Sequence, residues 1–135
     1  MLQKIFLKGE KKKIMKILML SWEYPPRIVG GISRVVHDLS HRLIKDGHEV
    51  TVVTYRDSNV PYFEDDNGVK VHRVDNFMIA PNNFVDWIMQ LNFNMVARAG
   101  EIIAEEGNFD VIHAHDWLVA YAAKTLKTAY NTTLV

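Results

Sequence analysis

The sequence predicts an α/β fold, a doubly wound parallel sheet with helices on both of its faces. Apolar runs of strand length alternate with amphipathic helical patterns along most of the chain. The first run, residues 16–21, is continuously apolar after its lysine, as in a strand buried on both faces. With 135 residues, of which 48% are hydrophobic and 24% charged, the chain has the size and composition of one globular domain.

The elements follow in a regular order. A first helix begins near Ile32 with its apolar residues on one stripe, and Gly47 marks its end. The stretch 55–68 is polar and is expected to be a loop. The further strands are expected at residues 50–54, 69–74, 110–115 and 132–135, and the further helices at 81–106 and 117–130. Right-handed crossovers then give the five strands the order 3-2-1-4-5.

Composition excludes several classes of function. A formal net charge of +0 gives no electrostatic case for nucleic acid or an anionic membrane as partner. No apolar run is long enough to span a bilayer, so we expect no membrane span. The absence of cysteine excludes disulfides, thiolate metal sites and cysteine nucleophiles, and it fits a reducing cytoplasm.

Residues 1–14 are expected to be a basic N-terminal extension outside the domain. They do not form a secretory signal, because the lysines follow the short apolar group instead of preceding it. At the other end, the apolar segment 132–135 is expected to begin a strand that the chain does not complete. We therefore expect residues 15–135 to be a truncated domain of a longer protein.

The loop between Trp22 and Gly31 is the first candidate for a ligand site. Gly30 and Gly31 precede the first helix, where backbone N–H groups and the helix dipole suit a phosphate. Tyr24 and Arg27, together with Trp22, give the loop flat surfaces and a charge. The alternative is that the two glycines only permit close packing of helix against strand.

His115, Asp116 and Trp117 form the second candidate, directly after the fourth expected strand. Ligands of open α/β sheets bind at the carboxyl ends of the strands, where the strand order reverses. Here that point lies between the first and fourth expected strands, so both candidates should meet in one crevice. Alternatively, His113 and His115 share one face as structural residues, Asp116 caps the next helix, and Trp117 belongs to the core.

Metal and nicotinamide sites are less well supported. His113 and His115 lack evident further ligands, and His37 and His41 have the spacing of a zinc-protease helix but with Asp38 in place of glutamate. His37 and His41 lie opposite the apolar stripe and are interpreted as a solvated face, so no metal is expected. The Gly-x-Gly-x-x-Gly fingerprint of dinucleotide-binding folds is absent.

An ordered set of motifs resembles the amino-terminal, Rossmann-like domain of GT-B glycosyltransferases. The resemblance is closest to the glycogen and starch synthase group and the related retaining families 4 and 5, and it covers about residues 15–135. The motifs are Ser-Trp-Glu-Tyr-Pro-Pro at 21–26, Gly-Gly-Ile at 30–32, Asp-Gly-His-Glu-Val at 46–50 and Phe-Asp-Val-Ile-His-Ala-His-Asp-Trp at 109–117.

The resemblance implies a two-domain enzyme that moves a sugar, glucose in the closest group, from a nucleotide diphosphate sugar to a glycan acceptor. It implies retention of anomeric configuration and no metal or other cofactor. Gly30 and Gly31 would approach the donor diphosphate, and Asp116 would be the catalytic residue of the cleft. Glucan synthases carry a lysine two residues before the paired glycines; this chain has Ile28 there, with Arg27 as the neighbouring cation.

By the same resemblance, His115 and Trp117 would shape the wall of the substrate cleft, to which we also assign Tyr24. The donor-binding carboxyl-terminal domain would lie beyond Val135, so this chain is expected to be the acceptor-side half and inactive alone. The alternative is a self-sufficient Rossmann-like module that binds a small ligand or a partner without transferase activity.

Overall fold

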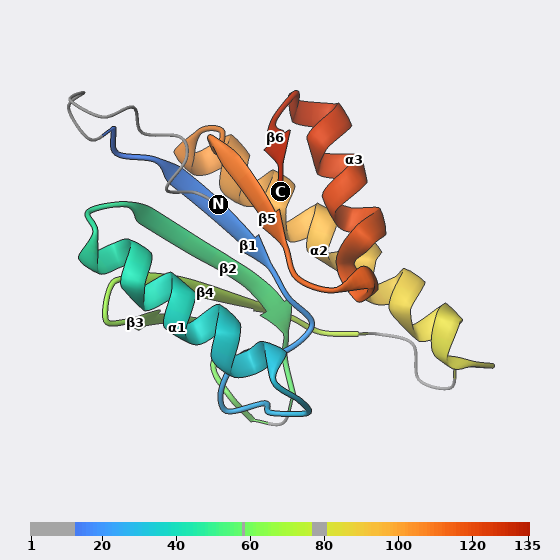
Figure 1. The fold of residues 1–135 in the computed structure, drawn as a ribbon. Coiled ribbons are helices and arrows are strands. Elements are labelled where there is room, and N and C mark those ends of the chain that lie inside the picture. Colours follow the sequence, from blue (N-terminus) through green and yellow to red (C-terminus); the bar gives the residue numbers. More distant parts are fainter. Residues whose placement is uncertain (1–12, 58, 77–80) are drawn as a thin grey trace.

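A six-stranded sheet forms the centre of the computed structural model, which describes residues 13–57, 59–76 and 81–135 (Figure 1). The strands are β1 (Lys16–Leu20), β2 (Glu49–Tyr55), β3 (Phe63–Asp66), β4 (Val69–Val74), β5 (Val111–Ala114) and β6 (Thr133–Leu134). Their order is β3-β4-β2-β1-β5-β6, and every neighbouring pair except β3 and β4 is parallel. The predicted α/β class and the order of the five predicted strands are confirmed.

The helices cover both faces of the sheet. They are α1 (Ile32–Lys45), α2 (Phe84–Glu106), the 3₁₀ helix η2 (Trp117–Val119) and α3 (Ala120–Tyr130). Helix α1 lies on one face, while α2 and α3 lie on the other (Figure 1).

Strand β1 explains why two layers of helices are needed. Ile17 and Met19 belong to the apolar cluster that includes α1, whereas Leu18 and Leu20 belong to the cluster that includes α2 and α3. All four side chains are almost completely buried, and each such burial contributes about 1.5–3 kcal/mol. The central strand therefore stabilises both layers at once.

The predicted loop 55–68 is wrong in its second half, because residues 63–66 form β3. This strand pairs antiparallel with β4 through a two-residue turn at Asn67 and Gly68, whose φ angles are 50° and 97°. Positive φ at both turn residues matches the twist of a tight hairpin. The strand lies at the edge of the sheet, so its polar side chains stay at least partly exposed and give no apolar pattern.

The ends of the other elements agree closely with the predicted ones. Gly47, just past the end of α1, has a φ of 96°, and the Asn83 side chain accepts a hydrogen bond from the Asp86 N–H at the start of α2 (2.9 Å). The last predicted helix differs, because its first turn is the separate helix η2. The predicted extension 1–14 lies outside the described residues except for Lys13 and Ile14.

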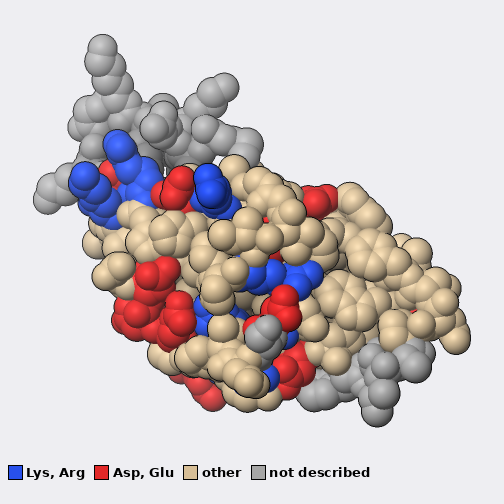
Figure 2. Space-filling model, turned by 90° about the horizontal axis from the view of Figure 1, so that it is seen from below, with Lys and Arg blue, Asp and Glu red and all other residues tan. Residues whose placement is uncertain are grey.

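Two further predictions concern the surface. On the face shown in Figure 2, acidic and basic side chains both occur in the left and central parts, while the right part carries almost none. Within the described part of the chain, no helix combines the length and the apolar character needed to cross a bilayer.

Candidate functional site

The two candidate segments leave the sheet side by side. Strands β1 and β5 are neighbours, with Leu20 opposite Ala114, and the His115 N–H donates to the Leu20 carbonyl (3.0 Å). The loop after β1 and the segment after β5 therefore start from adjacent points at the carboxyl edge of the sheet. The predicted adjacency of the two strand ends at the reversal of strand order is confirmed, and a shared crevice between the two segments stays a prediction.

A buried glutamate organises the glycine loop. The Glu23 side chain is 1% exposed, and its carboxylate accepts hydrogen bonds from the N–H groups of Val29 (2.8 Å), Gly30 (3.2 Å) and Ser33 (2.9 Å). The Gly30 N–H is therefore already hydrogen-bonded within the protein. A buried carboxylate needs such donors, and here it holds the chain in place just before α1.

Gly31 remains open to a ligand. Its φ of −71° is accessible to any residue, and a Cβ at this position would meet no atom within 4 Å. Within the described part of the chain, neither the Gly31 nor the Ile32 N–H has a hydrogen-bond acceptor. These two groups, at the positive end of the α1 dipole, are the donors left for an anion.

Arg27 is already engaged within the protein. Its Nη1 lies 2.6 Å from Asp57 Oδ2, and its guanidinium carbon lies 5.0 Å and 4.9 Å from the ring centres of Trp22 and Tyr55. It also borders a shallow pocket of about 430 Å³, which is lined by Trp22, Arg27, Pro81, Asn83, Phe84 and Trp87. The ion pair and the aromatic rings hold the guanidinium in one orientation.

Tyr24 is buried in the apolar layer under α1, and its place in the wall of the substrate cleft stays a prediction. Its hydroxyl donates to Asp66 Oδ2 (2.6 Å), and burial, followed by this hydrogen bond, raises the pKa of the Tyr24 hydroxyl. Nearby, Nη2 of the buried Arg73 donates to the Pro25 carbonyl (3.1 Å). Both contacts tie the loop to the β3–β4 hairpin.

Asp116 combines exposure with backbone strain. Its φ of 76° and ψ of 161° fall in a region that is populated almost only by glycine, which costs about 1–3 kcal/mol. Its Oδ1 accepts a hydrogen bond from the Trp117 N–H (2.6 Å), so the predicted capping contact is present. Trp117 itself is 63% exposed, so its alternative assignment to the core is wrong.

His113 and His115 lie on the same face, as strand alternation predicts, with ring centres 4.1 Å apart. Burial, and then the neighbouring His113, lowers the pKa of His115 to about 4, and burial also lowers the pKa of His113. His115 Nε2 lies 3.3 Å from the Met19 sulfur. Both imidazoles are therefore neutral near pH 7 and can shape the crevice wall without adding charge to it.

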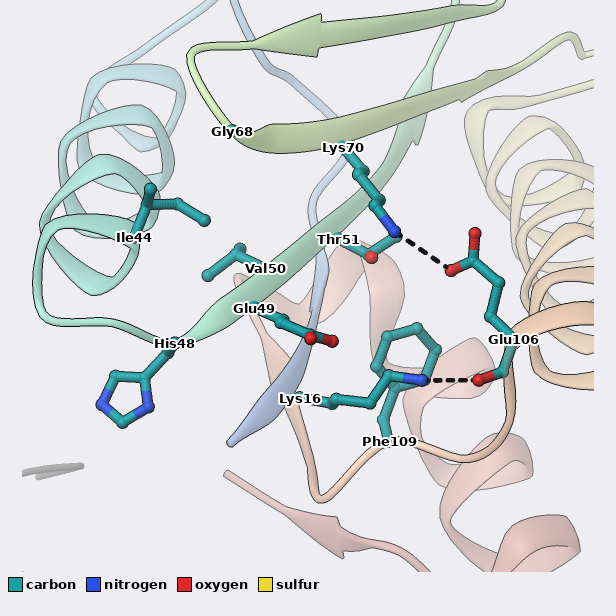
Figure 3. A pocket seen from close by; sticks show the side chains of 10 residues that line it. All are labelled: Lys16, Ile44, His48, Glu49, Val50, Thr51, Gly68, Lys70, Glu106 and Phe109. Carbon is teal, nitrogen blue, oxygen red and sulfur yellow. Dashed lines mark hydrogen bonds and ion pairs between the residues drawn. The ribbon is translucent and has the colours of Figure 1, made fainter. Parts of the chain in front are cut away.

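A second hollow, of about 220 Å³, lies at the opposite, amino end of the strands (Figure 3). Lys16 Nζ donates to the Glu106 carbonyl at the end of α2 (2.8 Å), and Lys70 Nζ lies 3.6 Å from the Glu106 carboxylate. These lysines balance the negative end of the helix dipole. This hollow differs from the candidate site at the carboxyl edge in two ways: it lies at the amino ends of the strands, and its lysines are already paired with Glu106.

The comparisons with known proteins identify the class. Residues 16–135 match the family described as the starch synthase catalytic domain. The chain therefore belongs to that family, and its relatives of known structure are GT-B glycosyltransferases, as the motifs predicted.

Individual relatives agree with this assignment. The chain is 40% identical over 113 residues to an uncharacterized glycosyltransferase of Methanocaldococcus jannaschii, which covers 84% of this chain and 28% of the relative. It is 36% identical over 135 residues to a glycogen synthase of Mycobacterium tuberculosis, covering 90% of this chain and 32% of the relative. A sucrose-phosphate synthase from Thermosynechococcus elongatus superposes with a TM-score of 0.74 at 20% identity, covering 89% of this chain and 32% of that structure. The chain thus spans about a third of the length of these relatives.

Proposed function

We propose that this chain is the acceptor-side domain of a retaining glycosyltransferase of the glycogen synthase type. The enzyme would transfer glucose from a nucleotide diphosphate sugar to a glycan, without a metal or other cofactor in the transfer step. The family match and the identity to a glycogen synthase support the reaction class. The lack of cysteine fits a cytoplasmic location, which stays a prediction.

The observation that carries the proposal is the conformation of Asp116. As the cap of the single 3₁₀ turn η2, the Asp116 side chain would contribute about 1 kcal/mol. The strain of its own backbone costs about 1–3 kcal/mol, so capping alone does not account for an aspartate at this position. Strained, exposed residues of this kind are concentrated at functional sites. Asp116 follows β5 at the point where the β1–α1 loop leaves the sheet, so its carboxylate would contact the sugar or the acceptor there.

The N terminus of α1 supplies the complementary group. Cleavage of the donor builds negative charge on the departing diphosphate, and the Gly31 and Ile32 N–H groups at the positive helix end would stabilise that charge. Gly30 would contribute by its lack of a side chain, since its own N–H is held by Glu23. Arg27, oriented by Asp57, would add positive potential, and the exposed face of Trp117 would contact the sugar.

A second domain would supply the remaining donor contacts, because the relatives are about three times as long as the matched region. We therefore expect no sugar transfer by residues 1–135 alone. A radiolabelled assay with nucleotide-glucose donors and a glycogen primer tests this. Robust turnover by the 135-residue chain would refute the two-domain proposal.

The residue roles are tested in the full-length protein that contains this chain. Asp116→Asn preserves shape and a capping oxygen, whereas Asp116→Ala removes both. We expect each to lower kcat by at least about 10²-fold, with the fold retained in circular dichroism. Wild-type turnover by both variants would return Asp116 to a purely structural role. If the full-length wild-type protein is folded and binds a nucleotide but transfers no sugar to any glycan, the result would instead favour the alternative of a binding module.

A further inference from the structure

We propose that His37, His41 and Asp66 form a zinc site that joins α1 to the β3–β4 hairpin. From the sequence alone, the two histidines are interpreted as a solvated face because they lie opposite the apolar stripe of the helix and Asp38 replaces the glutamate of the zinc-protease pattern. The structure supplies that ligand from β3, 25 residues after His41. This site is separate from the crevice between β1 and β5, and its zinc would have a structural role.

Two of the three ligand-atom distances are already close to those around a tetrahedral zinc ion. Asp66 Oδ2 lies 3.6 Å from His37 Nε2 and 3.4 Å from His41 Nε2, and the ligand atoms of all three residues lie within 4.8 Å of one another. Zinc–nitrogen bonds of about 2.0–2.1 Å in a tetrahedron place neighbouring ligand atoms about 3.3 Å apart. Small side-chain rotations would bring the three atoms around one ion.

Both ring nitrogens of His41 face acceptor oxygens, an arrangement that suits a cation between these groups. His41 Nδ1 lies 2.7 Å from the His37 carbonyl, and His41 Nε2 lies 3.1 Å from the Asp66 carbonyl. A neutral imidazole has one N–H, so Nδ1 donating to His37 leaves the Nε2 lone pair facing the oxygens of Asp66. A zinc ion at Nε2 would turn this unfavourable contact of electron-rich atoms into coordination.

The outer contacts match those that orient zinc ligands. His37 Nδ1 lies 3.1 Å from the Asp38 carboxylate, His41 Nδ1 faces a backbone carbonyl, and the Tyr24 hydroxyl donates to Asp66 (2.6 Å). Metal-bound histidines characteristically donate their second ring nitrogen to a carboxylate or carbonyl, which fixes the ring and strengthens the ligand. Asp38, which breaks the zinc-protease pattern, is here the partner of a ligand.

Ligand chemistry and exposure favour zinc. Two imidazoles with one carboxylate suit zinc, whereas magnesium and calcium prefer sites built from oxygen alone. The side chains of His37, His41 and Asp66 are 37%, 24% and 22% exposed, so an ion can enter from solvent and still be partly shielded. A bound ion would fix the hairpin to α1, and through Tyr24 it would also steady the β1–α1 loop.

The test is a calorimetric zinc titration of the purified protein after dialysis against a chelator. We expect one zinc per chain, with affinity lowered at least about tenfold in both His41→Gln and Asp66→Asn. Two controls should keep wild-type affinity. His113→Gln removes the other close pair of histidines, and Glu105→Gln removes an exposed acid of α2.

Each outcome decides the proposal. Absence of a binding heat, equal affinity in the two site variants, or loss of binding in His113→Gln would overturn it. A melting temperature of the wild-type protein that zinc leaves unchanged would also overturn it. If a variant does not fold, anomalous diffraction at the zinc edge on the wild-type protein locates the ion directly.

Discussion

Glu23→Gln tests the idea that an internal carboxylate shapes the glycine loop. Glutamine has one acceptor oxygen where Glu23 has two, and its amide group would face the N–H groups of Val29, Gly30 or Ser33. One or two partly or fully buried N–H groups would then lose their acceptor, at about 1–3 kcal/mol each. We expect the free energy of unfolding to fall by about 2–4 kcal/mol.

For a domain of this size, that loss corresponds to a decrease in melting temperature of roughly 6–12 °C. Urea denaturation followed by circular dichroism measures the free energy, and scanning calorimetry measures the melting temperature. Glu105→Gln, the same chemical change on the exposed face of α2, should alter stability by no more than about 0.5 kcal/mol. If the two variants are equally stable, the carboxylate does not hold the loop and the reasoning fails.

Three further changes test other parts of the crevice. Asp116→Gly relieves the strained φ of 76°, so we expect the free energy of unfolding to rise by about 1 kcal/mol while turnover of the full-length protein falls. Denaturation and kinetics of the same variant check both effects. A lower free energy of unfolding would show that the backbone at Asp116 is not strained. Gly30→Ala and Gly31→Ala should change the free energy of unfolding by no more than about 0.5 kcal/mol, because the nearest atom to either added methyl group is Glu23 Oε1, 4.0 Å from the one at Gly30. Any change in kinetics would then reflect the ligand, and an unchanged donor KM in both variants would rule out phosphate contact. The pKa of His115 is about 4 in the folded protein and 6.5 when the side chain is exposed, so between these pH values the unfolded chain binds one more proton than the folded one. The contribution of His115 to the free energy of unfolding is therefore complete above pH 6.5 and falls by about 2 kcal/mol by pH 5. Urea unfolding at the two pH values should show a smaller loss for His115→Gln than for the wild type.

The parallel part of the fold could be predicted because its strands are buried on both faces. Strand β1 therefore has a continuous apolar run, β2 has buried valines separated by threonines, and helix α1 between them carries a clear apolar stripe. Strand β3 could not be found in this way. Its Phe-Glu-Asp-Asp sequence makes its contribution through backbone pairing with β4 at the sheet edge, which leaves no hydrophobic pattern in the side chains.

The candidate site divides along similar lines. The meeting of the β1–α1 loop with Asp116 follows from topology alone, since carboxyl ends of parallel strands share one edge. The role of Glu23 could not be predicted because it depends on contacts within an irregular loop. One signal was present: an acid between Trp22 and Tyr24, directly after a buried strand, needs hydrogen-bond donors from the protein itself. Asp66 was missed because its approach to α1 depends on the unpredicted hairpin.

The three tethers of the β1–α1 loop have a consequence for how a ligand would be received. Arg27 is bonded to Asp57, Tyr24 to Asp66, and the Pro25 carbonyl to Arg73, so the loop is fixed from the β2, β3 and β4 side of the sheet. Its conformational entropy is lost during folding, which leaves little to lose when a ligand arrives. Substitutions of Asp66 or Arg73 in the hairpin would therefore change ligand affinity through the conformation of the loop, without any contact between the hairpin and the ligand.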